Sequence, residues 1–171
     1  YMVGAFVGYW SMTVFKLGFF ESLLAAMVVT TTLGVIIERV AYKPLRNSTR
    51  IAVLITAIGV SLLLEYGMMY FVGAAVRSYP PLPGFMTQSY ELGGVVVKTK
   101  QLLIIVISVT LMILLQFIVK RTRVGKAMRA VSQDADAARL MGINVNNTIS
   151  FTFALGSALA GAAGVLVGVY Y

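Results

Sequence analysis

Few side chains in this chain could do chemistry. Its 171 residues include no histidine and no cysteine, and six Asp and Glu stand against fourteen Lys and Arg. Without histidine the most common general base and metal ligand are missing, and without cysteine there are no disulfides and no thiolate metal sites. We therefore expect no hydrolytic triad built on these residues, no metal site and no cofactor.

Gly125-Lys126 is similar to the end of a phosphate-binding loop, but the rest of that motif is missing. Lys120 stands where the first glycine of the loop belongs, and Ala127 replaces the Ser or Thr whose hydroxyl would bind the metal ion. The flanking basic run cannot form the tight glycine-rich cradle. We therefore expect nucleotide hydrolysis to belong to another chain.

The elements that must position any functional residue here are membrane-spanning helices. Hydrophobic residues make up 59% of the chain and charged residues 12%, with a mean hydropathy of +0.88. Ordinary globular domains are about 45–50% apolar and about 25% charged. This composition argues against a soluble enzyme and against a disordered tail.

A spanning helix needs about 20 mostly apolar residues, and the hydropathy pattern predicts an all-α, polytopic transmembrane helix bundle in one domain. Both ends lie within apolar runs, so we expect a fragment that is incomplete at both ends. A small β-hairpin is expected at Gly93-Gly94, between strand-like flanks. The predicted spans are 1–15 (partial), 18–37, 51–73, 102–119 and 149–171, joined by loops 38–50, 74–101 and 120–148.

The net charge of +8 is unevenly placed. Four Lys and Arg lie in residues 39–50 and six in 120–139, so ten of the fourteen fall in two loops on the same side of the predicted bundle. By the positive-inside rule these loops are cytoplasmic and loop 74–101 is external. The charge then reports orientation in membrane lipid, and no nucleic-acid partner is needed to explain it.

The second basic loop contains a predicted short helix over 132–142. Ser132 is a suitable helix start, the following acids suit the positive end of the dipole, and Gly142 is a favourable C-cap. Such a helix leaves apolar residues on the cytoplasmic side. It either lies on the lipid headgroups or docks a soluble partner.

Several sequence segments of this chain resemble those of the branched-chain amino acid permeases of the LivH type. Asp136-Ala137-Ala138-x-x-x-Gly142 is similar to the EAA-x-x-x-G coupling motif of bacterial ABC importer permeases, with Asp in place of Glu. Three further strings carry the closer resemblance and run through nearly the whole chain: residues 38–46 (ERVAYKPLR), 121–130 (RTRVGKAMRA) with 142–145 (GINV), and 153–164 (FALGSALAGAAG).

The resemblance implies the membrane half of an ATP-driven importer of branched-chain amino acids, with no enzymatic chemistry of its own. In that family the permease pairs with a second, related permease and two cytoplasmic ATPase subunits, and a periplasmic binding protein delivers the amino acid. Asp136 in place of Glu shortens the acidic side chain of the motif by one methylene. The residues implied to couple the permease to the ATPase are Asp136, Ala137, Ala138, Leu140, Met141 and Gly142.

Two further features have a structural and a functional interpretation. Four small residues at i+4 spacing in the last span predict close helix packing, against the second permease, the translocation path or the same bundle; they are Gly156, Ala160, Gly164 and Gly168.

Glu65 is the one acid well inside a span. It either attracts the ammonium group of a passing amino acid or is a protonated or hydrogen-bonded packing residue.

Other functions stay open at this point. Within the same superfamily the substrate could be urea, a short amide or a simple sugar. An ion-coupled secondary transporter needs no ATPase, but it would need buried acids in several spans, and only Glu65 qualifies. A structural or assembly subunit of a membrane complex is a third possibility.

Overall fold

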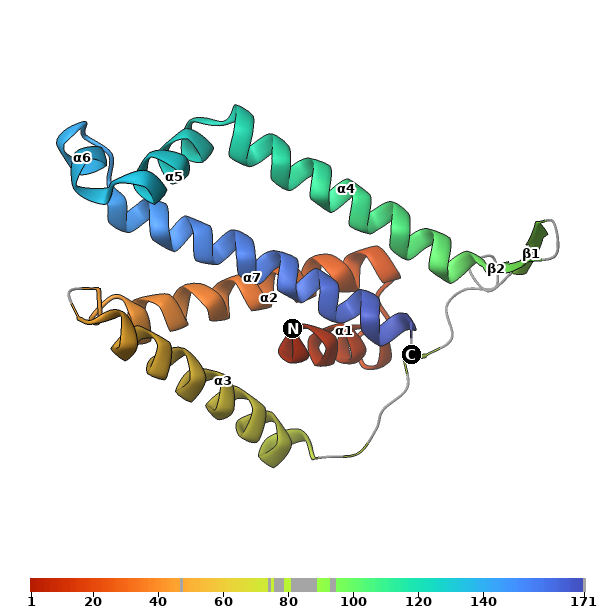
Figure 1. Ribbon diagram of the computed structural model, residues 1–171. Helices are drawn as coiled ribbons and strands as arrows, with labels where there is room; N and C mark the ends of the chain where they lie inside the picture. The colour runs from red at the N-terminus through yellow and green to blue at the C-terminus, as the bar shows by residue number, and fades with distance from the viewer. Residues whose placement is uncertain (47, 74, 76–78, 81–88, 93–94, 171) are drawn as a thin grey trace. The chain divides into compact units, whose positions relative to one another are not determined.

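The computed structural model describes residues 1–46, 48–73, 75, 79–80, 89–92 and 95–170, with no statement on the side chains of residues 50 and 89–97. Most of these residues are helical (Figure 1). In chain order the elements are α1 (Met2–Thr13), α2 (Phe19–Ile37), the π-helical turn η1 (Glu38–Tyr42), α3 (Arg50–Val72), β1 (Ser89–Leu92), β2 (Val95–Lys98), α4 (Thr99–Arg121), α5 (Arg123–Gln133), α6 (Ala135–Leu140) and α7 (Val145–Tyr170).

Four of these helical segments are long and apolar enough to cross a membrane, which confirms the predicted all-α transmembrane class. They are Phe19–Tyr42, Ile51–Val72, Thr99–Arg121 and Val145–Tyr170. The first helix, α1, has only 12 residues, about 18 Å at 1.5 Å per residue, and is shorter than the hydrocarbon core. The last span begins at Val145 rather than at the predicted residue 149, because Asn144 caps it.

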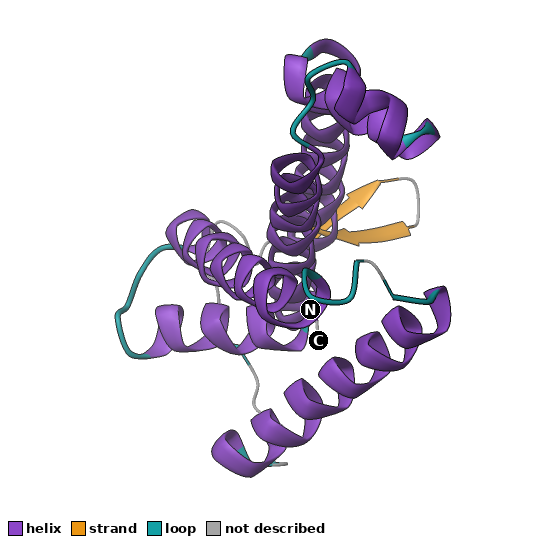
Figure 2. Ribbon diagram, turned by 90° about the vertical axis from the view of Figure 1, so that its left-hand side faces the viewer, coloured by secondary structure: helices purple, strands orange, loops and turns teal. Residues whose placement is uncertain are grey.

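The expected β-hairpin is confirmed at its flanks. Strands β1 and β2 pair antiparallel, with Ser89 opposite Lys98 and Leu92 opposite Val95. Figure 2 shows the two strands side by side in orange. Gly93 and Gly94, the predicted turn, lie outside the described residues.

The chain forms two compact units, which are described separately. The first comprises residues 1–79 with 153–169, and the second comprises residues 80–152 with Tyr170. Helix α7 therefore contributes its first two turns to the second unit and most of its length to the first.

Small residues let three helices of the first unit approach closely. A Cβ added at Gly4 of α1 would lie 2.6 Å from the Cα of Gly161 in α7. A Cβ at Gly161 would in turn meet the Thr30 hydroxyl and lie 3.0 Å from the carbonyl oxygen of Ala26, both in α2. Ala26 is fully buried there. Helices α1, α2 and α7 thus meet backbone to backbone, the arrangement that small residues allow in membrane bundles.

Tyr79 follows α3 and packs on the same unit. Its hydroxyl donates a hydrogen bond to the carbonyl oxygen of Ala5, and its ring meets that of Tyr9 edge-on, with the ring centroids 6.0 Å apart. Gly8 and Gly168 leave the space that the Tyr79 side chain fills. Burial raises the pKa of Tyr79 to about 12, so this hydroxyl keeps the proton that it donates to Ala5 at pH values where an ordinary tyrosine ionises.

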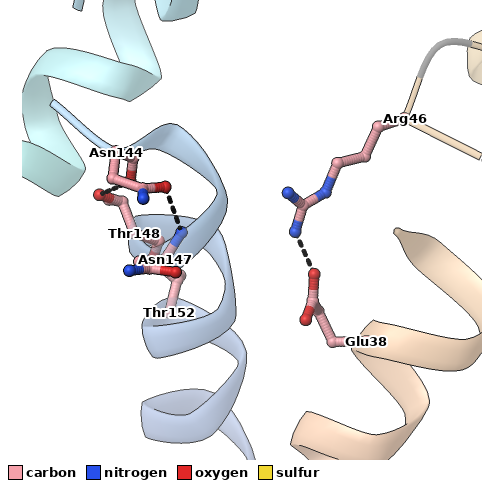
Figure 3. A network of polar contacts seen from close by, with 6 residues as sticks. All are labelled: Glu38, Arg46, Asn144, Asn147, Thr148 and Thr152. Atoms are coloured by element: carbon pink, nitrogen blue, oxygen red, sulfur yellow. Dashed lines mark hydrogen bonds and ion pairs between the residues drawn. The ribbon is translucent and has the colours of Figure 1, made fainter. Parts of the chain in front are cut away.

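A buried ion pair closes the turn after α2. Glu38, at the start of the π-helical turn, is fully buried and pairs with Arg46, whose side chain is 20% exposed (Figure 3). The two residues are eight positions apart in a loop, so no helical spacing links them in the sequence. The pair fixes the path of the chain between α2 and α3.

We expect Arg46→Ala to destabilise the protein by about 3 kcal/mol. This is the low end of the range for breaking a buried pair, because Arg46 keeps some contact with solvent. The variant leaves the buried Glu38 carboxylate without this guanidinium. Thermal unfolding of the protein in detergent measures the effect. The matched control is Lys43→Ala, which removes an exposed cation from the same turn; an equal shift in both variants would contradict the assignment.

Candidate functional site

The second unit contains loop 120–148, which the sequence identified as the candidate site. This loop begins with a sharp turn between α4 and α5. The Thr122 hydroxyl donates to the carbonyl oxygen of Ile118 (2.5 Å) and accepts from the backbone N–H of Gly125 (3.0 Å). Thr122 therefore ends α4 and caps α5. Gly125 is buried, and a Cβ there would collide with the carbonyl oxygens of Ile118 and Val119. Only glycine lets α5 fold back this closely onto the last turn of α4.

Helix α6 begins at Ala135 with Asp134 as its N-cap, which corrects the predicted start at Ser132. The Asp134 carboxylate accepts hydrogen bonds from the backbone N–H groups of Asp136 (2.9 Å) and Ala137 (3.0 Å). Ser132 instead lies in the last turn of α5, where its hydroxyl donates to the carbonyl oxygen of Arg129. Serine and aspartate are nearly equal N-caps, so the local sequence alone did not distinguish them. Residues 132–142 thus comprise the end of α5, the six residues of α6 and a turn.

The end of α6 is a Schellman motif, which confirms the predicted glycine C-cap. Gly142 has a φ of +82°, and its N–H bonds to the carbonyl oxygen of Arg139 while the N–H of Ile143 bonds to that of Ala138, each at 3.1 Å. This is the paired 5→2 and 6→1 pattern of the motif. The left-handed backbone at Gly142 strains any residue with a side chain, and β-branched residues most.

The tip of α6 presents two exposed apolar side chains. Leu140 is 90% exposed and Met141 83% exposed, whereas Ala138 is only 4% exposed. Ala137 and Asp136 are also exposed, and Asp136 pairs with Arg139 at 3.5 Å. Ala138 therefore faces into the unit, and the other residues of the predicted motif form its outer surface. We call Asp136–Gly142 the coupling tip, after the motif that it resembles in sequence.

A polar N-cap joins the coupling tip directly to α7. The side-chain oxygen of Asn144 accepts a hydrogen bond from the backbone N–H of Asn147 (3.1 Å). The backbone carbonyl oxygen of Asn144 accepts one from the Thr148 hydroxyl (3.0 Å; Figure 3). Thr148 is buried, and the Thr152 hydroxyl donates a hydrogen bond to the backbone carbonyl oxygen of Thr148. A shallow cavity of about 300 Å³ lies at this junction, lined by Arg139, Gly142, Ile143, Asn144, Val145 and Asn146. A single residue, Ile143, separates the Schellman glycine from the cap of a spanning helix.

The four small residues predicted to pack lie in different surroundings. A Cβ at Gly164 would meet the backbone of Tyr1 and Ala5 in α1, and one at Gly168 would meet the ring of Tyr79. Ala160 is half-buried. A Cβ at Gly156 would meet nothing within 4 Å among the described residues. The close contacts also use Gly34, Ser157 and Gly161, which the i+4 rule did not select.

Glu65 lies on α3 with its side chain exposed. Helix α3 belongs to the first unit, and the coupling tip belongs to the second. Within the described residues no group of three or more acidic, His or Cys side chains is arranged to hold a metal ion.

Comparison with known proteins agrees with these features. The family model described as "Branched-chain amino acid transport system / permease component" matches residues 1–171. The chain is 36% identical to the high-affinity branched-chain amino acid transport system permease protein BraD of Pseudomonas aeruginosa, over all of the chain and 59% of BraD. It is 35% identical to the permease proteins LivH of Salmonella typhimurium and Escherichia coli K12, over 86% of the chain and 49% of each relative.

The chain thus spans about half to three-fifths of the length of these curated relatives. No solved structure matches it significantly. The relatives and the four spanning helices place it in a multi-pass protein of the cell membrane. The chain belongs to the family of branched-chain amino acid transport system permease components.

Proposed function

We propose that this chain is part of the permease subunit of an ATP-driven importer that moves branched-chain amino acids across the bacterial inner membrane. The observation that carries the proposal is the coupling tip. Its two apolar side chains, Leu140 and Met141, are exposed at the end of a six-residue helix that is capped at both ends. An exposed apolar knob on a short helix suits a groove in a partner protein.

ATP hydrolysis takes place on two separate ATPase subunits, and the coupling tip carries their motion into the membrane. Because Asn144 caps α7 immediately after the tip, a displacement of α6 is transmitted to the start of a spanning helix rather than absorbed by a flexible linker. The spans then alternate between outward-facing and inward-facing arrangements.

The other expected partners follow from the same proposal. A second, homologous permease completes the translocation path, and a periplasmic amino-acid-binding protein delivers the substrate. The positive-inside rule places loops 38–50 and 120–148 in the cytoplasm and loop 74–101 outside. Support for the amino acid as substrate comes from the relatives, whose names specify high-affinity branched-chain amino acid transport.

Transport by the full-length permease tests the proposal. The permease is reconstituted in proteoliposomes with its cognate ATPases and binding protein, and uptake of labelled leucine, urea and glucose is compared. We expect leucine uptake that requires both ATP and the binding protein. Uptake driven by an ion gradient without ATP, or transport of only urea or glucose, would overturn it.

We expect Glu65→Gln to lower leucine uptake several-fold while leaving assembly with the ATPases unchanged. A carboxylate within a span attracts the ammonium group of the substrate and is costly to retain there without such a role. Uptake and co-purification are measured on the same preparation. Glu21→Gln, which neutralises an exposed acid in the first turn of α2, is the control. Normal uptake by Glu65→Gln would exclude Glu65 from the substrate path.

A further inference from the structure

Helix α5 and the end of α4 carry a concentration of positive charge that the transport proposal uses only to set the orientation in the membrane. Residues 120–133 include five Lys and Arg and no acidic residue. All five are exposed, and they are Lys120, Arg121, Arg123, Lys126 and Arg129. The two acids that follow are otherwise engaged, since Asp134 caps α6 and Asp136 pairs with Arg139. Among the described residues no carboxylate forms a salt bridge with these five cations.

The position of α5 along the chain places these charges at a membrane surface. Helix α4 has 23 residues and is about 35 Å long at 1.5 Å per residue, slightly longer than the hydrocarbon core. Its last turn therefore reaches the headgroup layer. Only Thr122 separates α4 from α5, and Gly125 packs against the carbonyl groups of Ile118 and Val119. The first turn of α5 is thus held against the last turn of a spanning helix.

The charges also lie along one side of α5. Arg123, Lys126 and Arg129 follow one another at three-residue spacing, which puts them on neighbouring positions of one helix face. The apolar residues of the helix occupy the other face; they are Val124, Ala127, Met128 and Val131, of which Val124 is 39% exposed. A helix with one basic and one apolar face is typical of segments that lie in the membrane interface.

We propose that the basic face of α5, with the last turn of α4, binds the phosphate groups of anionic phospholipids. This inference does not depend on the transport proposal, because it needs only the spanning α4 and the geometry of the corner. Lipid rather than an acidic protein surface is the occupant, because the cations begin within α4 itself and continue without a linker into α5. The bound headgroups hold α5 at the membrane surface and so fix one end of the segment that carries the coupling tip.

Lipid retention by the full-length permease tests this site. The permease is purified in detergent, phosphatidylglycerol or phosphatidylcholine is added, and bound lipid is counted by native mass spectrometry. The wild type should retain phosphatidylglycerol in preference to phosphatidylcholine. Lys126→Gln with Arg129→Gln should weaken phosphatidylglycerol binding about 25-fold, at about fivefold per removed charge. The control, Lys16→Gln with Lys43→Gln, removes two exposed cations outside the cluster and should leave binding near that of the wild type.

Unchanged phosphatidylglycerol binding in the Lys126 and Arg129 variant would overturn the proposal. If that variant also loses the ATPase subunits on co-purification, the surface belongs to an acidic protein partner instead. If the double variant does not purify as monodisperse protein, Lys126→Gln alone is measured, with an expected weakening of about fivefold.

Discussion

Gly142→Val should uncouple ATP hydrolysis from amino acid uptake in the assembled transporter. Gly142 has a φ of +82°, and the two backbone bonds that end α6 depend on this left-handed turn. A left-handed conformation costs an ordinary L-residue about 1–2 kcal/mol, and a β-branched residue more. Helix α6 has only six residues, so it has little other structure with which to hold the turn. We expect uptake per ATP hydrolysed to fall about tenfold or more.

The control for this prediction is Gly142→Asn. Asparagine adopts the left-handed region more readily than other residues with a side chain and can end a helix in the same way. Most of the coupling should therefore remain. Uptake and phosphate release are measured on the same proteoliposomes. A Val variant with wild-type coupling would show that the turn is not part of the transmission.

Replacing Leu140 and Met141 together with serine should remove most of the affinity for the ATPase subunits. These side chains are 90% and 83% exposed, so their loss costs the isolated permease little stability. Burying one such side chain in a partner contributes about 1.5–3 kcal/mol. Losing both should therefore weaken binding at least about a hundredfold. Co-purification of the ATPase subunits with the permease measures the effect.

The matched control for the double variant is Val14→Ser with Phe15→Ser. These two residues are 68% and 71% exposed and lie between α1 and α2, outside the second unit. Replacing both with serine removes an amount of exposed apolar surface comparable to that lost with Leu140 and Met141. The control should keep the ATPase subunits. If both double variants lose them, the effect is general destabilisation, and the coupling tip is not the docking site.

Much of the fold could be predicted from the sequence because the dominant energies are local. Long apolar runs specify spanning helices whatever their neighbours, and strand-like residues around a glycine pair specify a hairpin. The glycine at 142 could be recognised because an αL cap favours a residue without a side chain. The amphipathic α5 was visible as a basic stretch but was not recognised as a helix of its own.

What could not be predicted depends on contacts between distant residues or on small energy differences. The predicted start of α6 was wrong because Ser132 and Asp134 are comparable N-caps. Which of them caps the helix depends on how far α5 extends. The pair of Glu38 and Arg46 was missed because neither residue is unusual until the π-helical turn buries the carboxylate. The helix contacts at Gly161 depend on α1 and α2 meeting α7 there, which no spacing rule within α7 can reveal.

The central claim is that the coupling tip contacts the ATPase directly, and a cysteine at Met141 tests it. The chain has no cysteine of its own, so Met141→Cys introduces one thiol into this segment at a position where the side chain is exposed. The assembled transporter is treated with a short bifunctional thiol reagent after single cysteines are placed around the apolar groove of the ATPase. We predict a cross-linked permease–ATPase product whose yield changes when ATP is bound. Val14 lies between α1 and α2, at the opposite end of α2 from the basic loop 38–50, so Val14→Cys is the negative control. If Met141→Cys gives no more cross-linked product than Val14→Cys, the coupling tip does not dock the ATPase.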